Sequence, residues 1–415
     1  MLANFTRALL LSIALGPVAL AQNCPDPTAT NYNPAAVGND GSCQYPLTRA
    51  AVATKAALPP ELAESSGLQD VGGSLWTFND SGNAPVLFRV DSADGRVLQQ
   101  VRISNFDNVD WEDIAASAQY LYVGDVGNNS GDRRDLRVLR VAKSALGPAA
   151  TVATAEAITF SYPDQIDFTP RNNQHNFDCE AFFFAHDSLH LFTKNWVDLQ
   201  TRYYTVPATP GTHVAHLKGT FRVNGLITAA DLNATGTVAA LLGYRTSDAT
   251  SFVWLLSGFA GTQYLQANKR RIELPSALEI GQAEGISFVG RNRVFISNER
   301  VANALFTVPQ RLYALSLGPW VAAAPVLAAA GPRPAGGFAV APNPAHRTLN
   351  LARTGGVGSP ASLVLQDLQG RTVLRATLLA NNPAPSFDIS AVAAGLYVAK
   401  ITSAEGSFSQ KVAVQ

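Results

Sequence analysis

The chain has 415 residues, of which 47% are hydrophobic and 15% are charged, with 31 basic residues against 31 acidic ones. This balance gives no net attraction to nucleic acid or to an anionic membrane surface, so neither is predicted as a partner. The apolar fraction is enough for more than one core. The low charged fraction and the many small, polar and β-branched residues favour short strands joined by turns.

Residues 1–21 are predicted to be a cleaved signal peptide. Arg7 supplies a positive charge, residues 8–18 are mostly apolar, and an Ala-Leu-Ala sequence at 19–21 is a cleavage signal. Pro17 interrupts the apolar stretch, which is shorter than the ~20 residues of a membrane helix. No later stretch is long enough, so we expect a mature chain without a transmembrane segment. The expected location is secreted or on the outer cell surface.

The segment 22–47 contains Cys24 and Cys43 and too few apolar residues to form its own core. A disulfide between them is expected, and closing a loop of this size is worth about 3 kcal/mol. Four polar residues here are turn formers and also oxygen ligands of the kind that calcium binds, so both interpretations stay open. They are Asp26, Asn31, Asn33 and Asp40. The segment resembles a short module, ending in DGSC, that is common in secreted proteins of the Bacteroidetes.

One pattern recurs five times within residues 48–320. An acidic residue among small residues is followed, 13 to 16 positions later, by the end of a six-residue strand that closes on a charge. The acidic residues are Glu64, Glu112, Glu180, Asp231 and Glu284. The charged strand ends are Asp80, Asp125, Lys194, Arg245 and Glu299. Successive acidic residues lie 48, 68, 51 and 53 positions apart, a repeat length expected of propeller blades.

The predicted fold of this region is an all-β, five-bladed β-propeller. A third strand follows the charged strand end in every repeat, and a fourth follows in the first four. Residues 50–57 are expected to supply the missing strand of the last blade, which would close the ring and remove exposed sheet edges. The long second interval contains extra residues around 164–176, which we interpret as a loop. A sixth, degenerate blade is the alternative.

The two sets of charged residues differ in what they predict. Equivalent blade positions converge on the axis, so the five acidic residues would form a channel ring, most simply by accepting backbone N–H bonds between blades. The strand ends vary in chemistry at a fixed position, as expected of a site built on a scaffold. The candidate ligand-binding residues are Asp80, Asn83, Asp125, Asn128, Lys194, Trp196, Tyr244, Arg245, Glu299 and Arg300.

Within this set, calcium and anion binding are both open. Asp80, Asp125 and Glu299 could hold Ca²⁺, although no cofactor is certain. Lys194 and Arg245 could contact an anion.

The WEDIA sequence brings three carboxyl groups together at Asp110, Glu112 and Asp113. Paired carboxyl groups at a suitable separation hydrolyse glycosides, so glycosidase chemistry is one interpretation. However, Glu112 belongs to the repeated set, and Asp110 and Asp113 could simply flank a turn. No residue is assigned as catalytic from this motif.

The repeats as a whole support a second resemblance. The segments ESSGL, LWTFNDSGN, NVDWEDIA, LYVGDVGNN and AEGISF are similar to uncharacterised secreted propellers distantly related to the esterase-like phytase and SdiA-regulated families. The phytase resemblance implies calcium-dependent hydrolysis of phosphate esters, but no dense acidic cluster can be matched residue by residue. We therefore expect a binding propeller for a carbohydrate, peptide or phosphorylated ligand. A calcium-dependent hydrolase is the alternative, and we favour a binding protein over an enzyme.

A linker rich in Ala, Pro and Gly, 321–337, precedes the last segment, 338–415. Alternating apolar residues there predict a small antiparallel β-sandwich with a hairpin at DLQGR, 367–371. With its PNP, DIS, GLYV and KVAV sequences, the segment closely resembles the type A C-terminal sorting domain of the type IX secretion system. The resemblance implies an export address recognised by the secretion machinery. An adhesive immunoglobulin-like domain is the alternative.

Overall fold

The computed structural model describes residues 23–36, 38–303, 305–321, 337–354, 360–367, 370–379, 385–403 and 406–415. These residues form two compact units, one ending at Val321 and the other beginning at Gly337, and each is described by itself. The predicted signal peptide and nearly all of the predicted linker lie outside the described residues.

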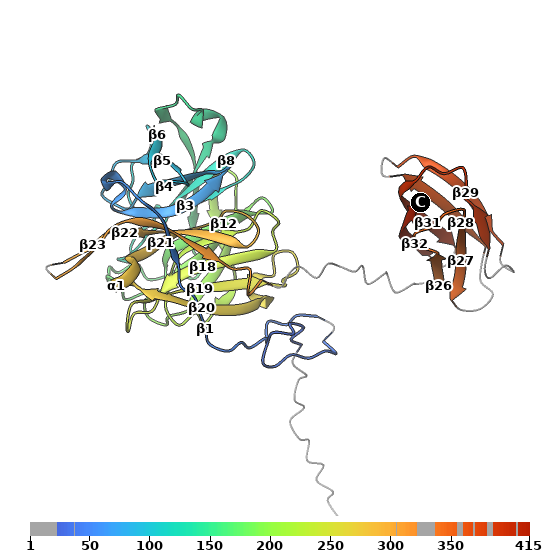
Figure 1. Ribbon diagram of the computed structural model, residues 1–415. Helices are drawn as coiled ribbons and strands as arrows, with labels where there is room; N and C mark the ends of the chain where they lie inside the picture. The colour runs from blue at the N-terminus through green and yellow to red at the C-terminus, as the bar shows by residue number, and fades with distance from the viewer. Residues whose placement is uncertain are drawn as a thin grey trace, which may run out of the picture. The chain divides into compact units, whose positions relative to one another are not determined.

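The first unit is a five-bladed β-propeller, in which each blade is an antiparallel sheet of four strands (Figure 1). The innermost strands contact one another in a ring; they are β3 (Ser65–Val71), β7 (Trp111–Ala116), β12 (Asp178–Ala185), β17 (Leu226–Leu232) and β21 (Gln282–Phe288). The second strands are β4 (Ser74–Asn79), β8 (Tyr120–Asp125), β13 (Ser188–Lys194), β18 (Val238–Tyr244) and β22 (Arg293–Glu299).

The outer half of each blade completes the sheet. The third strands are β5 (Val86–Asp91), β9 (Arg137–Ala142), β14 (Thr201–Pro207), β19 (Thr250–Ser257) and β25 (Arg311–Ser316). The fourth strands are β6 (Val97–Ile103), β11 (Ala155–Ser161), β16 (His216–Phe221), β20 (Asn268–Ser276) and β2 (Ala53–Ala57). Three short strands add to outer edges in parallel, namely β1 (Thr48–Arg49), β10 (Val152–Ala153) and β15 (Gly211–Val214).

The connections carry little regular structure. A small hairpin in the last blade joins β23 (Val301–Ala302) and β24 (Thr307–Val308). The helical turns are η1 (Pro60–Leu62), η2 (Lys143–Leu146), η3 (Tyr264–Gln266) and α1 (Ala277–Ile280). The segment 162–177, which leads from β11 to β12, has no strand and is the loop expected from the long interval.

The last blade is completed by the N-terminal part of the propeller. Strand β2 pairs antiparallel with β25, with Ala53 opposite Ala314 and Ala57 opposite Arg311. This confirms the expectation that residues 50–57 supply the missing fourth strand. The ring then has five sheets, and the described residues contain no sixth blade.

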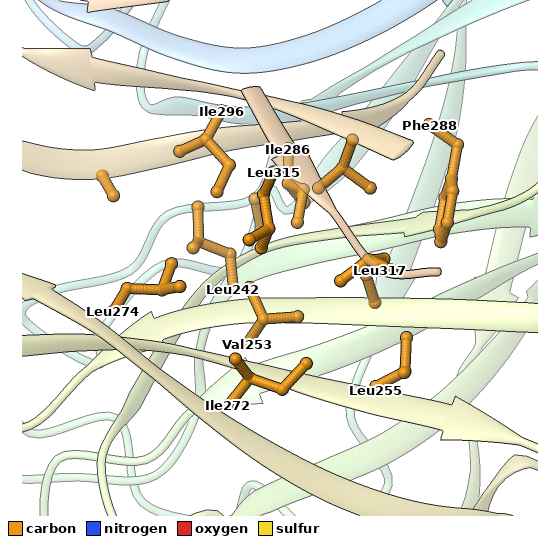
Figure 2. Close-up of a cluster of buried hydrophobic side chains, with 14 of the residues drawn as sticks. Leu242, Val253, Leu255, Ile272, Leu274, Ile286, Phe288, Ile296, Leu315 and Leu317 are labelled. Atoms are coloured by element: carbon orange, nitrogen blue, oxygen red, sulfur yellow. The ribbon is translucent and has the colours of Figure 1, made fainter. Parts of the chain in front are cut away.

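The core of the propeller lies between neighbouring blades. Because side chains alternate along a strand, each sheet presents one apolar face to the next blade. Figure 2 shows one such layer, in which Leu242 and Val253 of the fourth blade meet Ile286 and Ile296 of the fifth. Each fully buried aliphatic side chain of this kind contributes roughly 1.5–3 kcal/mol. The repeated alternation of apolar residues therefore holds the blades together.

Hydrogen bonds between blades cross the axis of the propeller. One carboxylate oxygen of Asp113, in β7, accepts the N–H groups of Phe182 and Ala230 from the next two blades, each at 3.0 Å. The Ser66 hydroxyl donates to the Glu112 carbonyl at 2.7 Å. The interpretation that Asp113 flanks a turn is therefore wrong: it lies within a strand and ties three blades together.

The segment before β1 is held to the fourth blade. The expected disulfide between Cys24 and Cys43 is confirmed. The guanidinium of Arg270, on β20, lies 4.0 Å from the ring centroid of Tyr45 and donates to Thr28 at 2.8 Å. Lys269 donates to the Gly41 carbonyl at 3.0 Å. The segment thus covers the outer edge of this blade, where an open sheet would expose unpaired backbone groups.

Three of the four polar residues of this segment behave as turn formers, and Asn31 bonds the distant Ser42 and Gln44. Oxygens of Asp26, Asn33 and Asp40 accept backbone N–H groups two residues further on, and the Asn31 amide donates to the Ser42 carbonyl. This pattern is the side-chain turn expected of Asp and Asn.

The second unit is a β-sandwich. One sheet has the order β26 (Gly337–Ala341), β27 (Thr348–Thr354) and β30 (Ser386–Asp388). The other has the order β29 (Thr372–Leu378), β28 (Ala361–Asp367), β31 (Gly395–Ser403) and β32 (Gly406–Val414). Leu349, Leu363 and Ile401 are among the buried residues between them. Strands β28 and β29 form the expected hairpin, closed by an Asp367–Arg371 ion pair at 2.7 Å.

Candidate functional site

A cavity of about 210 Å³ opens at the end of the propeller axis where the innermost strands begin. All five blades contribute to it, which is what convergence of repeated positions predicts. The lining residues are Ser66, Asp80, Glu112, Asn129, Glu180, Lys194, Trp196, Tyr244, Gln282, Glu284 and Glu299. We call this cavity the acidic mouth.

Three of its carboxyl groups are placed by β-bulges. The register of the inner strands shifts at Glu112, Glu180 and Glu284, so each of these residues has no partner in its ladder. A bulge bends the strand and redirects the side chain of the extra residue. Here it places the three carboxyl groups at the same mouth. In the fourth blade the bulge is at Thr228, which carries no charge.

The expected ring of five equivalent acidic residues is wrong at Glu64 and Asp231. Glu64 precedes β3, and its carboxylate accepts a hydrogen bond from the Asn83 amide at 2.6 Å. Asp231 lies three residues beyond the bulge of β17, towards the opposite end of the axis. Its carboxylate accepts the N–H of Phe288 at 2.7 Å. Asp231 therefore ties the fourth blade to the fifth, the structural role expected for the whole ring.

The charged strand ends also divide into two groups. Lys194 and Glu299 occupy equivalent positions in their blades, because each pairs with the inner-strand residue two positions before the bulge. In the fourth blade Tyr244 occupies this position. Asp80 continues the same position in the first blade, where its N–H donates to the Glu64 carbonyl at 3.0 Å. All four line the acidic mouth.

Asp125 and Arg245 are not brought into the acidic mouth. Asp125 pairs with Trp111, the inner-strand residue immediately before the bulge. Because side chains alternate along a strand, this difference of one position turns the Asp125 side chain away from the axis. It is fully buried, and its carboxylate is bound by Arg133 at 3.0 Å and Arg137 at 2.7 Å. Both its oxygens are thus already occupied by guanidinium groups.

Arg245 follows β18 at the rim of the fourth blade. Its guanidinium pairs with Asp248 at 2.7 Å and with Glu273 at 3.1 Å. The sequence therefore predicted the strand ends to within one residue but not the directions of their side chains.

The remaining candidates have different surroundings. Trp196 lines the acidic mouth, and its indole N–H donates to Asp178 at 2.9 Å. Asn128 is buried and ties the second blade to the third, because its N–H donates to Asp178 at 2.7 Å. Asn83 bonds Glu64 outside the lining, and Arg300 has an exposed side chain that does not line the cavity.

Lys194 is the one cationic group in the lining. Its ammonium forms a buried ion pair with Glu180 and lies 5.0 Å from the ring centroid of Trp196 and 5.7 Å from that of Tyr244. Burial lowers the pKa of Lys194, but the carboxylate of Glu180 outweighs this, and the net direction is well above the ordinary value. Lys194 therefore stays charged, with its charge already paired.

The other carboxyl groups have raised pKa values. Burial, reinforced by the neighbouring Glu284, raises the pKa of Glu299 to about 9. Burial raises the pKa of Glu284 to about 7 and that of Asp110 to about 6. It raises the pKa of Glu112 well above the ordinary range, with Glu180 adding to the effect. The mouth thus favours protons, cations or hydroxyl groups over anions.

Two carboxyl groups of the acidic mouth, together with the neighbouring Asp110, can hold a cation. Asp80, Asp110 and Glu112 each offer a carboxylate oxygen, and these oxygens lie within 4.8 Å of one another. Carboxylate oxygens are the ligands that calcium prefers. The set differs from the predicted one, because Asp110 and Glu112 replace Asp125 and Glu299.

Three lining residues, Ser66, Asn129 and Gln282, are not among the candidates taken from the sequence. Ser66 lines the first blade, where no acidic residue enters the lining from the inner strand, and Gln282 bonds Glu284 in the fifth. No residue type marks Gln282 in advance.

The comparison with known families bears on the second unit. Residues 339–415 match the family model of the secretion system C-terminal sorting domain. The chain carries a type IX sorting domain. The protein is therefore exported through the type IX system to the cell surface or beyond. No helix in the described part of the chain has the length and apolar character needed to cross a membrane.

The chain also has distant likenesses among solved structures. The chain is similar to a GH43_1 enzyme from Xanthomonas citri, with 10% identity and a TM-score of 0.36 over 64% of this chain and 89% of that one. It is also similar to an exo-beta-1,3-galactanase from Phanerochaete chrysosporium in complex with beta-1,3-galactotriose. There the identity is 9% and the TM-score 0.40, over 91% and 92% of the two chains. Neither likeness carries an argument about activity. No curated protein matches the chain.

Proposed function

We propose that the exported propeller binds the end of a carbohydrate chain in the acidic mouth. The observation that carries this proposal is the composition of the lining: five carboxyl groups against one lysine that is already paired with Glu180. Hydroxyl groups donate hydrogen bonds to carboxylates, whereas a phosphorylated ligand would be repelled by them. The proposal therefore favours the carbohydrate over the phosphorylated ligand.

The size and the aromatic residues of the mouth support a small ring as the ligand. Ligand cavities commonly measure about 300–1,000 Å³, and this one is smaller, at about 210 Å³. Trp196 and Tyr244 are partly exposed in its lining. An aromatic face beside hydrogen-bonding groups suits a sugar ring, which has an apolar face and polar edges. One terminal sugar would fill the cavity, with the rest of the chain outside.

The binding test uses the full exported chain on an array of glycans, followed by calorimetry with each ligand found. Trp196→Ala and Glu112→Gln should each weaken binding by about tenfold or more, because each removes a group that contacts the ligand. Glu156→Gln is the matched control, since this exposed carboxylate lies on β11 and pairs with Arg140. Equal affinity in all four proteins would refute the proposal, as would the absence of any bound glycan.

A calcium-dependent hydrolase of phosphate esters is the second candidate. The close approach of Asp80, Asp110 and Glu112 favours it, because a divalent cation held there would offset the repulsion of a phosphate group. Turnover of a phosphate ester panel would be measured with calcium and with a chelator. Calcium-dependent turnover that is lost in Asp110→Asn would establish the hydrolase. No turnover under either condition would eliminate it.

A further inference from the structure

A second cavity lies between the first and second blades, apart from the acidic mouth. It measures about 160 Å³ and is lined by Val71, Ser74, Trp76, Arg89, Leu121, Lys143 and Leu146. A larger cavity, of about 340 Å³, adjoins it and shares Val71 and Lys143. Neither of these two cavities shares a lining residue with the acidic mouth. We call the smaller one the basic pocket.

The basic pocket contains two cationic side chains without a carboxylate partner. Arg89, on β5, is partly buried, and no ion pair or hydrogen bond of its guanidinium is found among the described residues. Its Nε atom is buried and unbonded. The Lys143 ammonium donates to the Ser117 carbonyl at 2.6 Å but forms no ion pair with a described residue. Burial lowers the pKa of Lys143, as expected of a cation without a counter-ion.

Other arginines of the propeller show that this lack of partners is not general. Arg133 and Arg137 share the Asp125 carboxylate, and Arg140 pairs with Glu156 at 2.7 Å. On the side of the basic pocket, Asp70 lines the adjoining cavity with Lys143 but forms no ion pair with it. The Gln99 amide oxygen, on the strand next to Arg89, is also unbonded. A neutral amide would not balance the charge of either cation.

The remaining walls of the basic pocket are apolar. Trp76, Leu121 and Leu146 are buried residues of the core between the first two blades, and Val71 packs against them. A partly buried charge in such surroundings is costly unless an opposite charge accompanies it. Two cationic donors in the lining of one pocket with apolar walls suit a carboxylate that carries a hydrocarbon group.

We infer that the basic pocket is a second ligand site, which binds a small organic carboxylate through Arg89 and Lys143. The carboxylate lies between the two cations, and the hydrocarbon group lies against Trp76 and Leu121. The pocket admits only a few carbon atoms beyond the carboxylate, but the adjoining cavity leaves room for a longer group. This site is independent of the proposed function of the acidic mouth.

The test is calorimetry on the full chain with hexanoate as the probe and hexanol as the uncharged control. Wild-type protein should bind hexanoate, with an affinity that falls as salt is added, and should not bind hexanol measurably. Arg89→Gln and Lys143→Met should each weaken hexanoate binding by about tenfold or more, because each removes a charged hydrogen bond. Arg102→Gln, at an exposed position on β6, should leave the affinity unchanged.

Two measurements keep the outcomes apart. The melting temperature of each variant shows whether the fold is intact, and indole fluorescence of wild type and Trp76→Phe reports whether hexanoate reaches the pocket. Binding that survives both cation substitutions in folded protein would overturn the inference, and so would a wild-type protein that does not bind hexanoate. Glu112→Gln should bind hexanoate normally, so a failed carbohydrate site would not affect this result.

Discussion

At the scale of single residues, the acidic mouth holds carboxyl groups that folding brings together against their own electrostatic preference. Glu112, Glu180 and Glu284 come from three blades, and the one ammonium in the lining is paired with one of them. Such an excess of buried carboxyl groups is stable only with bound protons or with a ligand that accepts their hydrogen bonds or neutralises them. This cost fits a site kept for binding rather than for stability.

The titration of Glu299 predicts a pH dependence of stability. Its pKa is raised to about 9 in the folded protein from an ordinary value of 4.5, mainly by burial. Between these values the folded state binds more protons than the unfolded state, so stability falls as the pH rises. We expect the melting temperature to fall as the pH is raised from about 5 to about 9. Glu299→Gln should flatten the fall and raise the melting temperature at the alkaline end.

Differential scanning calorimetry across this range would check the prediction, with Glu156→Gln as the exposed control. A wild-type melting temperature that rises with pH through the same window would contradict it.

Asp113 carries a second prediction at this scale. Its carboxylate accepts the N–H groups of Phe182, Ala230 and Ile114. Each buried N–H group left without an acceptor costs about 1–3 kcal/mol. Asp113→Ala should therefore lower the free energy of unfolding several times more than a typical surface substitution does. Asp113→Asn keeps one oxygen in place and should lose less.

Denaturant unfolding of the three proteins would measure this order. Equal stability of Asp113→Ala and wild type would show that the layer across the axis does not depend on this carboxylate.

At the scale of strands, the sequence predicted the blades better than it predicted the directions of side chains. The interval between repeats located every inner strand, because blade length is set by four strands and their turns. Asp125 and Lys194 each end a second strand, yet one faces two arginines and the other the acidic mouth. A shift of one residue moves a side chain to the opposite face of the strand, and the residue type does not indicate that the shift occurs. Asp231 was misplaced for the same reason.

The strand that completes the last blade allows a matched test. Ala56, on β2, is buried against Leu58 and Leu62, whereas Thr54 on the same strand is exposed. Ala56→Asp places an unpaired carboxylate in this contact and should cost about 2 kcal/mol or more. Thr54→Asp should stay within about 0.5 kcal/mol of wild type.

Hydrogen exchange at β25 would report whether β2 has separated, and thermal unfolding would give the loss. If Ala56→Asp and Thr54→Asp behaved alike, β2 would not be a stabilising part of the last blade.

At the scale of the whole molecule, the two units have separate tasks. The sorting domain directs export, and the propeller carries the cavities. We expect a chain truncated before residue 339 to stay inside the cell envelope, because it lacks the segment that matches the sorting-domain family. Glu112→Gln should be exported like wild type. Fractionation of cells followed by immunoblotting would decide, and surface display of the truncated chain would contradict the assignment.

The pairing of β2 with β25 also sets how the propeller can fold. It joins residues 53–57 to residues 311–314, so nearly the whole unit lies in the loop that this contact closes. Contacts so distant in sequence form late, because the entropy of the intervening chain is lost before they add stability. Until residue 316 has been synthesised, β22 has no outer neighbour and its edge is open to other chains. We therefore expect the pairing that completes the ring to be among the last steps of folding.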